Sequence, residues 1–317
     1  MKKPLLILTG PTAAGKTDLS IALAKKLNGA VISADSMQVY KYMNIGSAKI
    51  LPEEMQGVRH YLVDVLDPRE EFHVARFQQM AREAMEEIYQ NGQLPIVVGG
   101  TGFYIQALLK EVNFAESSGE LPLRRELEET ARTKGGAVLH ERLKQVDPES
   151  AAAIHPNNVK RVIRALEYYQ ETGRPISRHN EEQREKKPPY TYAYFVLTDD
   201  RARLYERIGQ RVDRMVEQGL VEEVRWLKDH GYGRELVSMQ GLGYKELFPY
   251  LDGTCTLEEA VEIIKRDTRH FAKRQLTWFR REPDVTWLNW QDFGYDRDRL
   301  LERMLELWEE RKREEKE

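Results

Sequence analysis

Eight residues near the start of the chain have the types and the spacing of a loop that binds phosphate groups. Gly10, Gly15, Lys16 and Thr17 fit the pattern Gly-x4-Gly-Lys-Ser/Thr, between an apolar run and a helical one. Glycines let backbone N–H groups converge on phosphate oxygens, and Lys16 adds a full positive charge. The Thr17 hydroxyl suits Mg²⁺. The residues expected to bind the phosphate group are Gly10, Pro11, Thr12, Ala13, Ala14, Gly15, Lys16 and Thr17.

The loop itself does not specify which phosphate compound it binds. ATP or GTP is the usual ligand, and hydrolytic proteins of this class carry a carboxylate after a long apolar strand. The corresponding apolar run here, residues 95–98, is followed by Gly99, Gly100, Thr101 and Gly102, with no carboxylate. These small residues are typical of a backbone anion nest with a hydroxyl nearby, or of a tight strand-to-helix turn. The pattern leaves both interpretations open.

Asp35 directly follows a second apolar run, residues 30–33. Three interpretations fit it. With Gln38 it forms an Asp-x-x-Gln pattern, which is typical of a cap on a following helix. It also suits the water shell of Mg²⁺, or the role of general base for a nucleophile. Sequence alone does not choose among them.

A late helical segment concentrates positive charge on one side. Residues 265–282 contain seven Lys or Arg and two Asp or Glu. At 100° per residue, four cations share one face and three large apolar residues share the opposite face. Such a row of cations predicts contact with a sugar-phosphate backbone, and the alternative is a solvated face. The cations are Arg266, Arg269, Lys273 and Arg280, and the apolar residues are Ile264, Phe271 and Trp278.

Two further segments have features that suit RNA. In the helical segment 157–170, Lys160, Arg161 and Arg164 point away from the apolar stripe. The run Gly241-Leu242-Gly243-Tyr244 combines a flexible backbone with an aromatic ring. Tyr244 either stacks on an unstacked base or lies half-buried in the core.

These residues need a scaffold, and the apolar pattern predicts an α/β fold. Strands are expected at 5–8, 30–33, 61–65, 95–98, 192–197 and 285–288, and helices at 16–27 and 74–89. Alternating strands and helices indicate a parallel sheet with helices on both faces and a site beyond the strands' carboxyl ends. We expect a phosphate-loop core from residues 1–115 and 189–317, and a helical insertion domain at 116–188.

Composition narrows the class of protein. The chain has 317 residues, a formal net charge of −3 and one cysteine, Cys255, so it forms no internal disulfide and no multi-cysteine zinc site. It has neither a secretory segment nor an apolar run long enough to span a membrane. We therefore expect a cytoplasmic protein, with nothing that demands more than a monomer.

Several segments together resemble the tRNA dimethylallyltransferase family. The resemblance rests on GPTAAGKT (10–17), ADSMQVY (34–40), MNIGSAK (43–49), GGTGFY (99–104), NNVKRVIRALE (157–167), GLGYKEL (241–247) and KRQLTWFR (273–280). They follow the family's order and span nearly the whole chain. Ala14, Ser47 and Phe103 are small departures, and none removes a reactive group. The single cysteine excludes the zinc finger of many eukaryotic members, so the bacterial form is implied.

The resemblance implies a particular use of the loop. The bound diphosphate would belong to dimethylallyl diphosphate, with pyrophosphate as leaving group and Mg²⁺ beside Thr17. The acceptor would be the exocyclic amine of an adenosine on the 3′ side of the tRNA anticodon. Asp35 would be the base, Thr101 would lie near the scissile oxygen, and Lys16 would bind the diphosphate. Arg211 is our choice for a further diphosphate contact, although Arg207 and Arg214 share its helical face.

The resemblance also implies a set of residues that contact the tRNA anticodon stem-loop. The expected contacts are Asp35, Ser36, Met37, Gln38, Thr101, Lys160, Arg161, Arg164, Gly241, Leu242, Gly243, Tyr244, Lys245, Arg266, Arg269, Lys273, Arg274, Gln275, Trp278 and Arg280.

Three other functions use the same loop. A prenyltransferase acting on free adenine nucleotides would share Asp35 but lack the RNA-binding elements around 241–280. A phosphate-loop small-molecule kinase would consume ATP and would not need the basic helices. An RNA-binding NTPase would carry a carboxylate after a core strand, and the sequence offers no convincing candidate.

Overall fold

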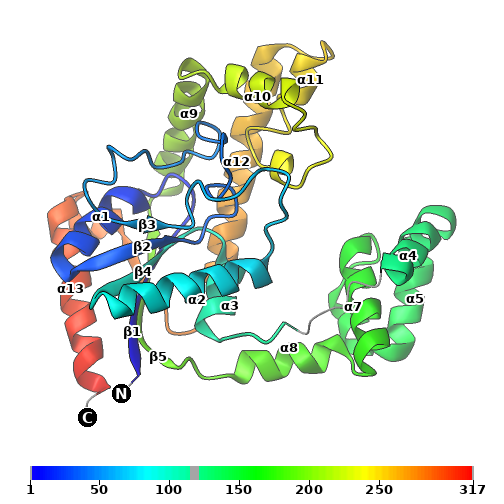
Figure 1. Cartoon of the computed structure of the whole chain (residues 1–317), viewed down its shortest axis with the longest axis horizontal. Helices are drawn as coiled ribbons and strands as arrows, with labels where there is room; N and C mark the ends of the chain where they lie inside the picture. The colour runs from blue at the N-terminus through cyan, green and yellow to red at the C-terminus, as the bar shows by residue number, and fades with distance from the viewer. Residues whose placement is uncertain (1, 115–120, 316–317) are drawn as a thin grey trace. The chain divides into compact units, whose positions relative to one another are not determined.

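The computed structural model describes residues 2–114 and 121–315 and divides the chain into two compact units. One unit consists of Met1–Leu109 and Pro189–Glu317, and the other is Lys110–Pro188 (Figure 1). The second unit interrupts the first between strands β4 and β5, and it begins a little before residue 116, where we expected the insertion to start. Each unit is described by itself.

A single parallel sheet forms the centre of the first unit. Its strand order is β3-β2-β4-β1-β5-β6, and every pairing in the described chain is parallel. Leu5 and Ile7 of β1 belong to the core on one face, whereas Leu6 and Leu8 belong to the core on the other. The strands are β1 (Lys3–Thr9), β2 (Gly29–Ser33), β3 (His60–Tyr61), β4 (Leu94–Gly99), β5 (Tyr190–Thr198) and β6 (Thr286–Asn289).

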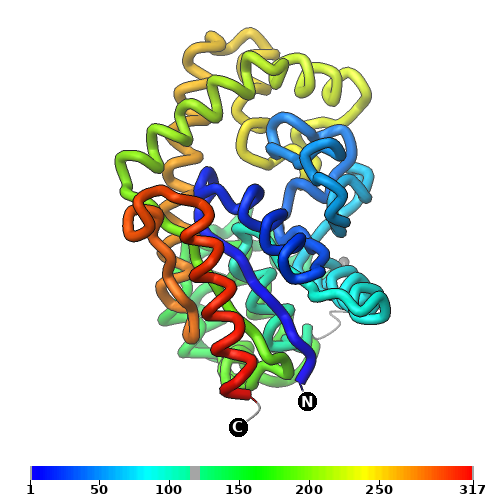
Figure 2. The backbone as a smooth tube through the Cα atoms, turned by 90° about the vertical axis from the view of Figure 1, so that its left-hand side faces the viewer, coloured from blue at the N-terminus to red at the C-terminus, as the bar shows by residue number. Residues whose placement is uncertain are grey.

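Helices cover both faces of this sheet, as a parallel sheet requires. Helices α1 and α13 pack on one face, and α2, α3, α10 and α12 contribute to the core on the other. Figure 2 shows α13 running beside the sheet, with both chain ends close together; there Lys2 pairs with Glu315 at 3.0 Å. The helices of this unit are α1 (Lys16–Leu27), α2 (Val74–Gln90), α3 (Gly102–Leu109), α9 (Arg201–Glu217), α10 (Leu220–Asp229), α11 (Phe248–Leu251), α12 (Leu257–Phe279) and α13 (Arg297–Glu314), with short 3-10 helices at Ser238–Gln240 and Trp290–Phe293.

The helix starts follow local sequence signals. The Thr256 hydroxyl accepts from the N–H of Glu259, whose carboxylate accepts in turn from the N–H of Thr256, so a capping box begins α12. Asp200 and Asp296 cap α9 and α13 in the same way through their carboxylates. The caps at Asp200 and Thr256 determine where α9 and α12, the two long helices that border the site, begin.

Among its described residues, 110–114 and 121–188, the second unit consists of helices joined by turns and irregular segments and contains no strand. Leu139, Leu143, Val162 and Ile163 are buried at its centre. The buried carboxylate of Asp147 caps one helix by accepting from the N–H of Ser150 at 3.0 Å. The helices are α4 (Leu121–Lys134), α5 (Gly136–Val146), α6 (Pro148–Ala153), α7 (Val159–Thr172) and α8 (Ile176–Glu185).

One expected strand is much shorter than its apolar pattern suggested. We expected residues 61–65 to form a strand, but β3 ends at Tyr61. Leu62 and Asp64 have φ angles of 61° and 59°, which no extended strand allows. The Asp64 carboxylate turns instead towards Lys49, at 2.6 Å. The remaining expected strands are confirmed, with ends shifted by one or two residues.

No helix in the described part of the chain is both long enough and apolar enough to cross a membrane.

Candidate functional site

A cavity of about 650 Å³ opens at the carboxyl ends of the central strands. Its walls come from the phosphate loop, the turn after β2, the loop around residues 46–48, the turn after β4, α9, the segment 237–245 and α12. All of these belong to the first unit. Ligands bind at this edge of open parallel sheets because loops from neighbouring strands converge there.

The phosphate loop has the backbone that its pattern predicted. Gly10 has φ 147° and Gly15 has φ 84°, values that side chains disfavour. A Cβ on Gly10 would also lie 2.5 Å from the carbonyl oxygen of Leu197. The loop leads directly into α1, whose first residue is Lys16. Thr12, Ala13, Gly15, Lys16 and Thr17 line the cavity, whereas Ala14 is buried behind it.

Lys16 is a buried cation at the floor of this cavity. Its ammonium donates to the carbonyl oxygens of Gly10 and Pro11, at 3.0 and 2.7 Å. Burial, together with the nearby charge of Arg211, lowers the pKa of Lys16 to about 7, although Asp35 acts in the opposite direction. An anion here would favour the charged form of Lys16.

Helix α9 adds more positive charge to the same cavity. Arg207, Arg211 and Arg214 all line it. Burial lowers the pKa of the Arg211 guanidinium below its usual value, and the charge of Asp35 partly opposes this. Several cations close together in a cavity are costly unless an anion joins them. The floor of the cavity therefore suits a di-anionic or more highly charged ligand.

Asp35 lies where the sequence predicted, in the turn after β2 and on the cavity wall. Its Oδ1 accepts from the N–H groups of Met37 and Gln38, at 2.8 and 3.3 Å. Within the described chain Oδ2 has no hydrogen bond. The helix that the Asp-x-x-Gln pattern suggested is absent, because residues 35–49 form turns. The interpretation of Asp35 as a helix cap is therefore wrong.

Gln38 supports the turn instead of facing a ligand with its amide. Its Oε1 accepts from the Ser33 hydroxyl at 3.3 Å, and its Nε2 donates to the carbonyl of Ala48 at 3.1 Å. Ser36, Met37 and Gln38 line the cavity. The turn after Asp35 is thus tied to the loop that ends at Lys49.

The small residues after β4 form a tight turn into α3. A Cβ on Gly99 would overlap the backbone of Ala34, and one on Gly102 would overlap the indole of Trp278. These glycines therefore make room for the neighbouring strand and for α12. Thr101 borders the cavity, and its N–H donates to the carbonyl of Ala34 at 3.3 Å.

Gln275 joins the two turns that flank β1. Its Oε1 accepts from the N–H of Thr12 at 2.9 Å, and its Nε2 donates to the carbonyl of Gly100 at 3.0 Å. The side chain is 6% exposed. Both ends of the Gln275 amide are thus used inside the protein, although the side chain also borders the cavity.

Helix α12 was expected to have a row of exposed cations on one face and apolar residues on the opposite face, and the structure agrees with this in part. Arg266, Lys273, Arg274 and Arg280 are exposed, but Arg269 is only partly so. Arg266 also pairs with Asp267 at 2.9 Å, and Arg274 lines the cavity. On the other face Ile264 is buried, whereas Phe271 borders the cavity and Trp278 is partly exposed against Gly102. Ile264 and Trp278 therefore pack with the core, as expected of an apolar stripe, whereas Phe271 borders the cavity.

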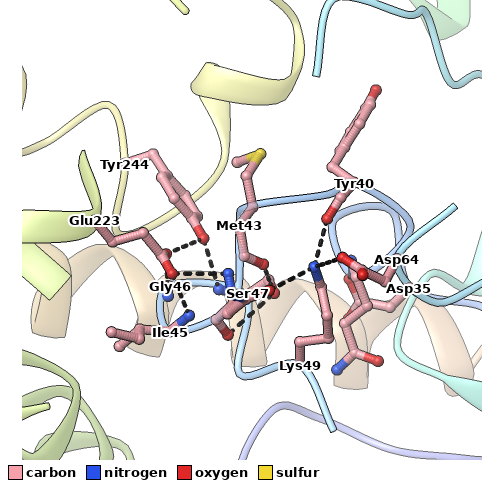
Figure 3. Close-up of polar contacts among 12 residues, drawn as sticks. Asp35, Tyr40, Met43, Ile45, Gly46, Ser47, Lys49, Asp64, Glu223 and Tyr244 are labelled. Carbon is pink, nitrogen blue, oxygen red and sulfur yellow. Dashed lines mark hydrogen bonds and ion pairs between the residues drawn. The ribbon is translucent and has the colours of Figure 1, made fainter. Parts of the chain in front are cut away.

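Tyr244 does not form a stacking platform. Its side chain is 0% exposed, and its hydroxyl donates to Oε1 of Glu223 at 2.8 Å (Figure 3). The same hydroxyl accepts from the N–H of Ser47 at 3.1 Å. The expected contact of Tyr244 with an RNA base is therefore wrong. Its neighbours Gly241, Leu242, Gly243 and Lys245 do line the cavity.

The remaining expected contacts lie on α7 of the second unit. Lys160 and Arg161 are exposed there and Arg164 is partly so, while Val162 and Ile163 are buried. The amphipathic pattern of this helix is as expected from the sequence.

The residues around Thr17 set limits on a metal site. No group of three His, Cys, Asp or Glu residues that suits a metal occurs in the described chain. Thr17 is exposed in the first turn of α1, and its hydroxyl has no hydrogen bond to described residues. Mg²⁺ commonly binds through few protein oxygens together with phosphate oxygens and water. The residues present therefore fit Mg²⁺ that arrives with a phosphate ligand.

Asp199 and Trp290 were missed by sequence reasoning. Asp199, 0% exposed at its side chain, follows β5 and lies 3.7 Å from Arg207 and 3.6 Å from Arg203. The indole of Trp290 donates to the carbonyl of Ala14 at 2.8 Å and packs against Gly15. The signal for Asp199 was a carboxylate directly after an apolar run, whereas Trp290 offered none.

Known proteins resemble this chain over most of its length. A family model described as IPP transferase matches residues 38–282. A tRNA dimethylallyltransferase of Lachnoclostridium phytofermentans is 63% identical over 300 residues, covering 95% of this chain and 96% of the relative. One of Acetivibrio thermocellus is 52% identical, covering 92% and 93%.

Solved structures of related enzymes are also similar to this chain. The full-length tRNA isopentenylpyrophosphate transferase from Bacillus halodurans is 46% identical, with a TM-score of 0.75 and 100% of both chains covered. A eukaryotic dimethylallyltransferase acting on tRNA is 33% identical, with a TM-score of 0.80, and the match covers 90% of this chain and 74% of that one. The chain belongs to the IPP transferase family, the family of the tRNA dimethylallyltransferases.

Proposed function

We propose that this protein transfers the dimethylallyl group of dimethylallyl diphosphate to the exocyclic amine of the adenosine 3′ to the anticodon in tRNA. The observation that carries the proposal is a cavity in which Lys16, the arginines of α9 and the carboxylate of Asp35 line the same space. Family membership supports the choice of prenyl transfer over ATP chemistry. The proposed substrate, tRNA, implies a cytoplasmic site of action.

The donor's diphosphate would occupy the floor of the cavity. Lys16, Arg207 and Arg211, with the loop N–H groups, would bind its oxygens. In the reaction the bond between the allylic carbon and the diphosphate oxygen breaks, and pyrophosphate leaves with the electron pair. Groups that stabilise the growing negative charge on this oxygen lower the barrier most. Thr101 borders the same space and would reach the scissile oxygen.

The acceptor amine would lie beside Asp35. A bond forms between the amine nitrogen and the allylic carbon, and the amine loses one proton. Asp35 would take that proton, for which its Oδ2 remains available. The adenosine must leave the anticodon stack to reach the cavity. Apolar side chains at the cavity, including Tyr104, Val212, Ile264 and Phe271, would exclude water from the cationic allyl group.

Mg²⁺ is part of the proposal because Thr17 offers a free hydroxyl beside the phosphate loop. When bound, Mg²⁺ would neutralise part of the charge on the leaving diphosphate. Thr17 is the residue that would hold it.

The tRNA would contact basic surfaces in both units. On α12 the row of Arg266, Arg269 and Lys273, whose side chains are exposed or partly exposed, suits phosphate oxygens. Lys160 and Arg161 on α7 offer a second basic surface.

The first test is a transfer assay with the purified protein. Radiolabelled dimethylallyl diphosphate should label unmodified tRNA when Mg²⁺ is present, and should label AMP poorly. A tRNA with guanosine in place of the target adenosine is the control and should stay unlabelled. Labelled AMP with unlabelled tRNA would instead identify a nucleotide prenyltransferase, and brisk ATP consumption without label would identify a kinase.

A second prediction concerns the base. Asp35→Asn keeps the oxygen that accepts from Met37 and Gln38 but removes the basic carboxylate. We expect kcat to fall about 10²- to 10⁴-fold, with tRNA affinity nearly unchanged. Asp18→Asn, which removes a charge elsewhere on the cavity wall, should keep kcat within about threefold of wild type. Near-normal turnover by Asp35→Asn would exclude Asp35 as the base.

A third prediction follows from the pKa of Lys16. Because this pKa is about 7 in the free protein, Lys16 is mostly charged at pH 6 and mostly neutral at pH 8. Bound pyrophosphate raises the pKa of Lys16, so Lys16 takes up a proton on binding. The fraction of a proton taken up increases as pH rises, because more of the free protein then has a neutral Lys16. Relative to Lys16→Arg, which stays charged, wild type should take up about 0.1 extra proton at pH 6 and about 0.9 at pH 8. Calorimetry in buffers of different ionisation enthalpy measures this; equal uptake by both proteins would contradict it.

A fourth prediction concerns α12. Replacing Arg266, Arg269 and Lys273 with Gln should weaken tRNA binding and reduce the slope of log K against log salt by about 2. The control replaces Arg297, Arg299 and Arg303 of α13, which pair with acidic neighbours. That triple variant should bind tRNA with the wild-type slope. If the α12 variant also keeps the wild-type slope, this face does not contact the tRNA backbone.

A further inference from the structure

A carboxylate on α10 binds three consecutive backbone N–H groups of the loop that continues into the cavity wall. Glu223 Oε2 accepts from the N–H groups of Asn44 and Ile45, each at 2.8 Å. Its Oε1 accepts from the N–H of Gly46 at 3.1 Å (Figure 3). Consecutive N–H groups that converge in this way form a nest for an anion. Here the anion is a side chain of the protein itself.

Tyr244 completes this arrangement from a third segment. Its hydroxyl donates to Glu223 and accepts from the N–H of Ser47, so it links the carboxylate with the next residue of the same loop. A side chain on Gly46 would lie 2.6 Å from the Tyr244 ring, so only glycine fits there. Burial and the Glu223 carboxylate raise the pKa of Tyr244 well above its usual value, so the hydroxyl keeps its proton.

Lys49 holds the far end of the loop. Its buried ammonium donates to the carbonyl of Tyr40 at 2.5 Å, to Oδ1 of Asn44 at 2.8 Å and to Oδ1 of Asp64 at 2.6 Å (Figure 3). The loop 44–48 therefore lies between two anchors, and every hydrogen-bonding group of both anchors has a partner. Such a loop has little freedom to move.

The restrained loop is connected to the proposed base. Gly46, Ser47 and Ala48 line the cavity. The carbonyl of Ala48 accepts from the side chain of Gln38, whose own N–H donates to Asp35 at 3.3 Å. A shift of the loop would move Ala48, and through Gln38 it would move the turn that carries Asp35.

We propose that Glu223, with Tyr244, is a positioning residue: it locks the loop 44–48 so that Asp35 stays aligned with the acceptor amine. This inference rests on the proposed function. Neither residue lines the cavity, so they act through the loop and not on the substrate. Since a misplacement of about 1 Å can lower a rate about 100-fold, the arrangement affects turnover more than donor binding.

A glutamate side chain satisfies the donors of this nest, whereas a glutamine side chain does not. A carboxylate only accepts hydrogen bonds, so it satisfies all four donors that converge on it. In Glu223→Gln one oxygen becomes an amide that donates, and it faces N–H or O–H donors. At least one of these donors, most of which are partly buried, would then lack a protein partner, which is costly. The shape and volume of the side chain hardly change.

The test compares three variants in the transfer assay. Glu223→Gln should lower kcat about 10- to 100-fold, with the KM for dimethylallyl diphosphate within about twofold of wild type. Tyr244→Phe, which removes a single oxygen, should lower kcat about 3- to 10-fold, and the double variant should lower it by less than the product of the two. Glu222→Gln is the matched control, because the adjacent Glu222 is 69% exposed and forms an ion pair with Arg225 at 3.9 Å; its kcat should equal that of wild type.

Hydrogen exchange separates positioning from general stability. In Glu223→Gln the amides of residues 44–47 should exchange faster, while those of β1 and β4 keep their wild-type protection. The inference would be overturned if Glu223→Gln had the kcat of wild type per folded molecule and differed only in a lower denaturation midpoint. Unchanged exchange at residues 44–47 would also overturn it. If wild type itself transfers no label to tRNA, the proposed function fails, and the exchange result still decides whether Glu223 restrains the loop.

Discussion

The concentration of positive charge around Lys16 is the constraint on which the rest of the cavity depends. Lys16 lies buried with Arg207 and Arg211 nearby, and their mutual repulsion favours separation or neutralisation. Asp35 supplies one opposing charge inside the cavity, and Asp199 another behind Arg207. The remaining excess of positive charge is available for a diphosphate, which brings more negative charge than either carboxylate.

Several buried hydrogen bonds hold the backbone around these cations in place, and none of these bonds brings a negative charge. Trp290 bonds the backbone of Ala14, so the last strand and its 3-10 helix support the phosphate loop from outside the cavity. Gln275 bonds Thr12 on one side and Gly100 on the other, and it holds the two turns at a constant separation. Neither residue carries charge. Neutral hydrogen bonds and packing therefore offset the mutual repulsion of the cations at the cavity floor. Because these contacts add no negative charge, the positive electrostatic field remains directed into the cavity.

The sequence predicted those features that depend on local pattern. The phosphate loop, the helix from Lys16 to Leu27 and the place of Asp35 after β2 were all expected, since each follows from residues adjacent in the chain. Tyr244 was misassigned, and the bridging role of Gln275 was not foreseen, because their partners lie about 200 and 260 residues away in sequence, which periodicity does not reveal. The short β3 has a more local cause: the pairing of Asp64 with Lys49, 15 residues away, overrides the strand pattern of its apolar neighbours.

The contacts of three side chains explain why segments so far apart in the chain form one site. Tyr244 packs against Gly46, Gln275 against Gly100 and Trp278 against Gly102. In each pair a large or polar side chain from the C-terminal part occupies space that a glycine of the N-terminal part leaves open. A Cβ at any of these glycines would displace its partner, and with it the loop 44–48 or the turn that presents Thr101. The segments 43–49, 99–104, 241–247 and 273–280 are therefore matched surfaces, and a change in one requires a compensating change in its partner. This mutual fit accounts for why the combination of these segments, more than the phosphate loop alone, identifies the chemistry of the cavity.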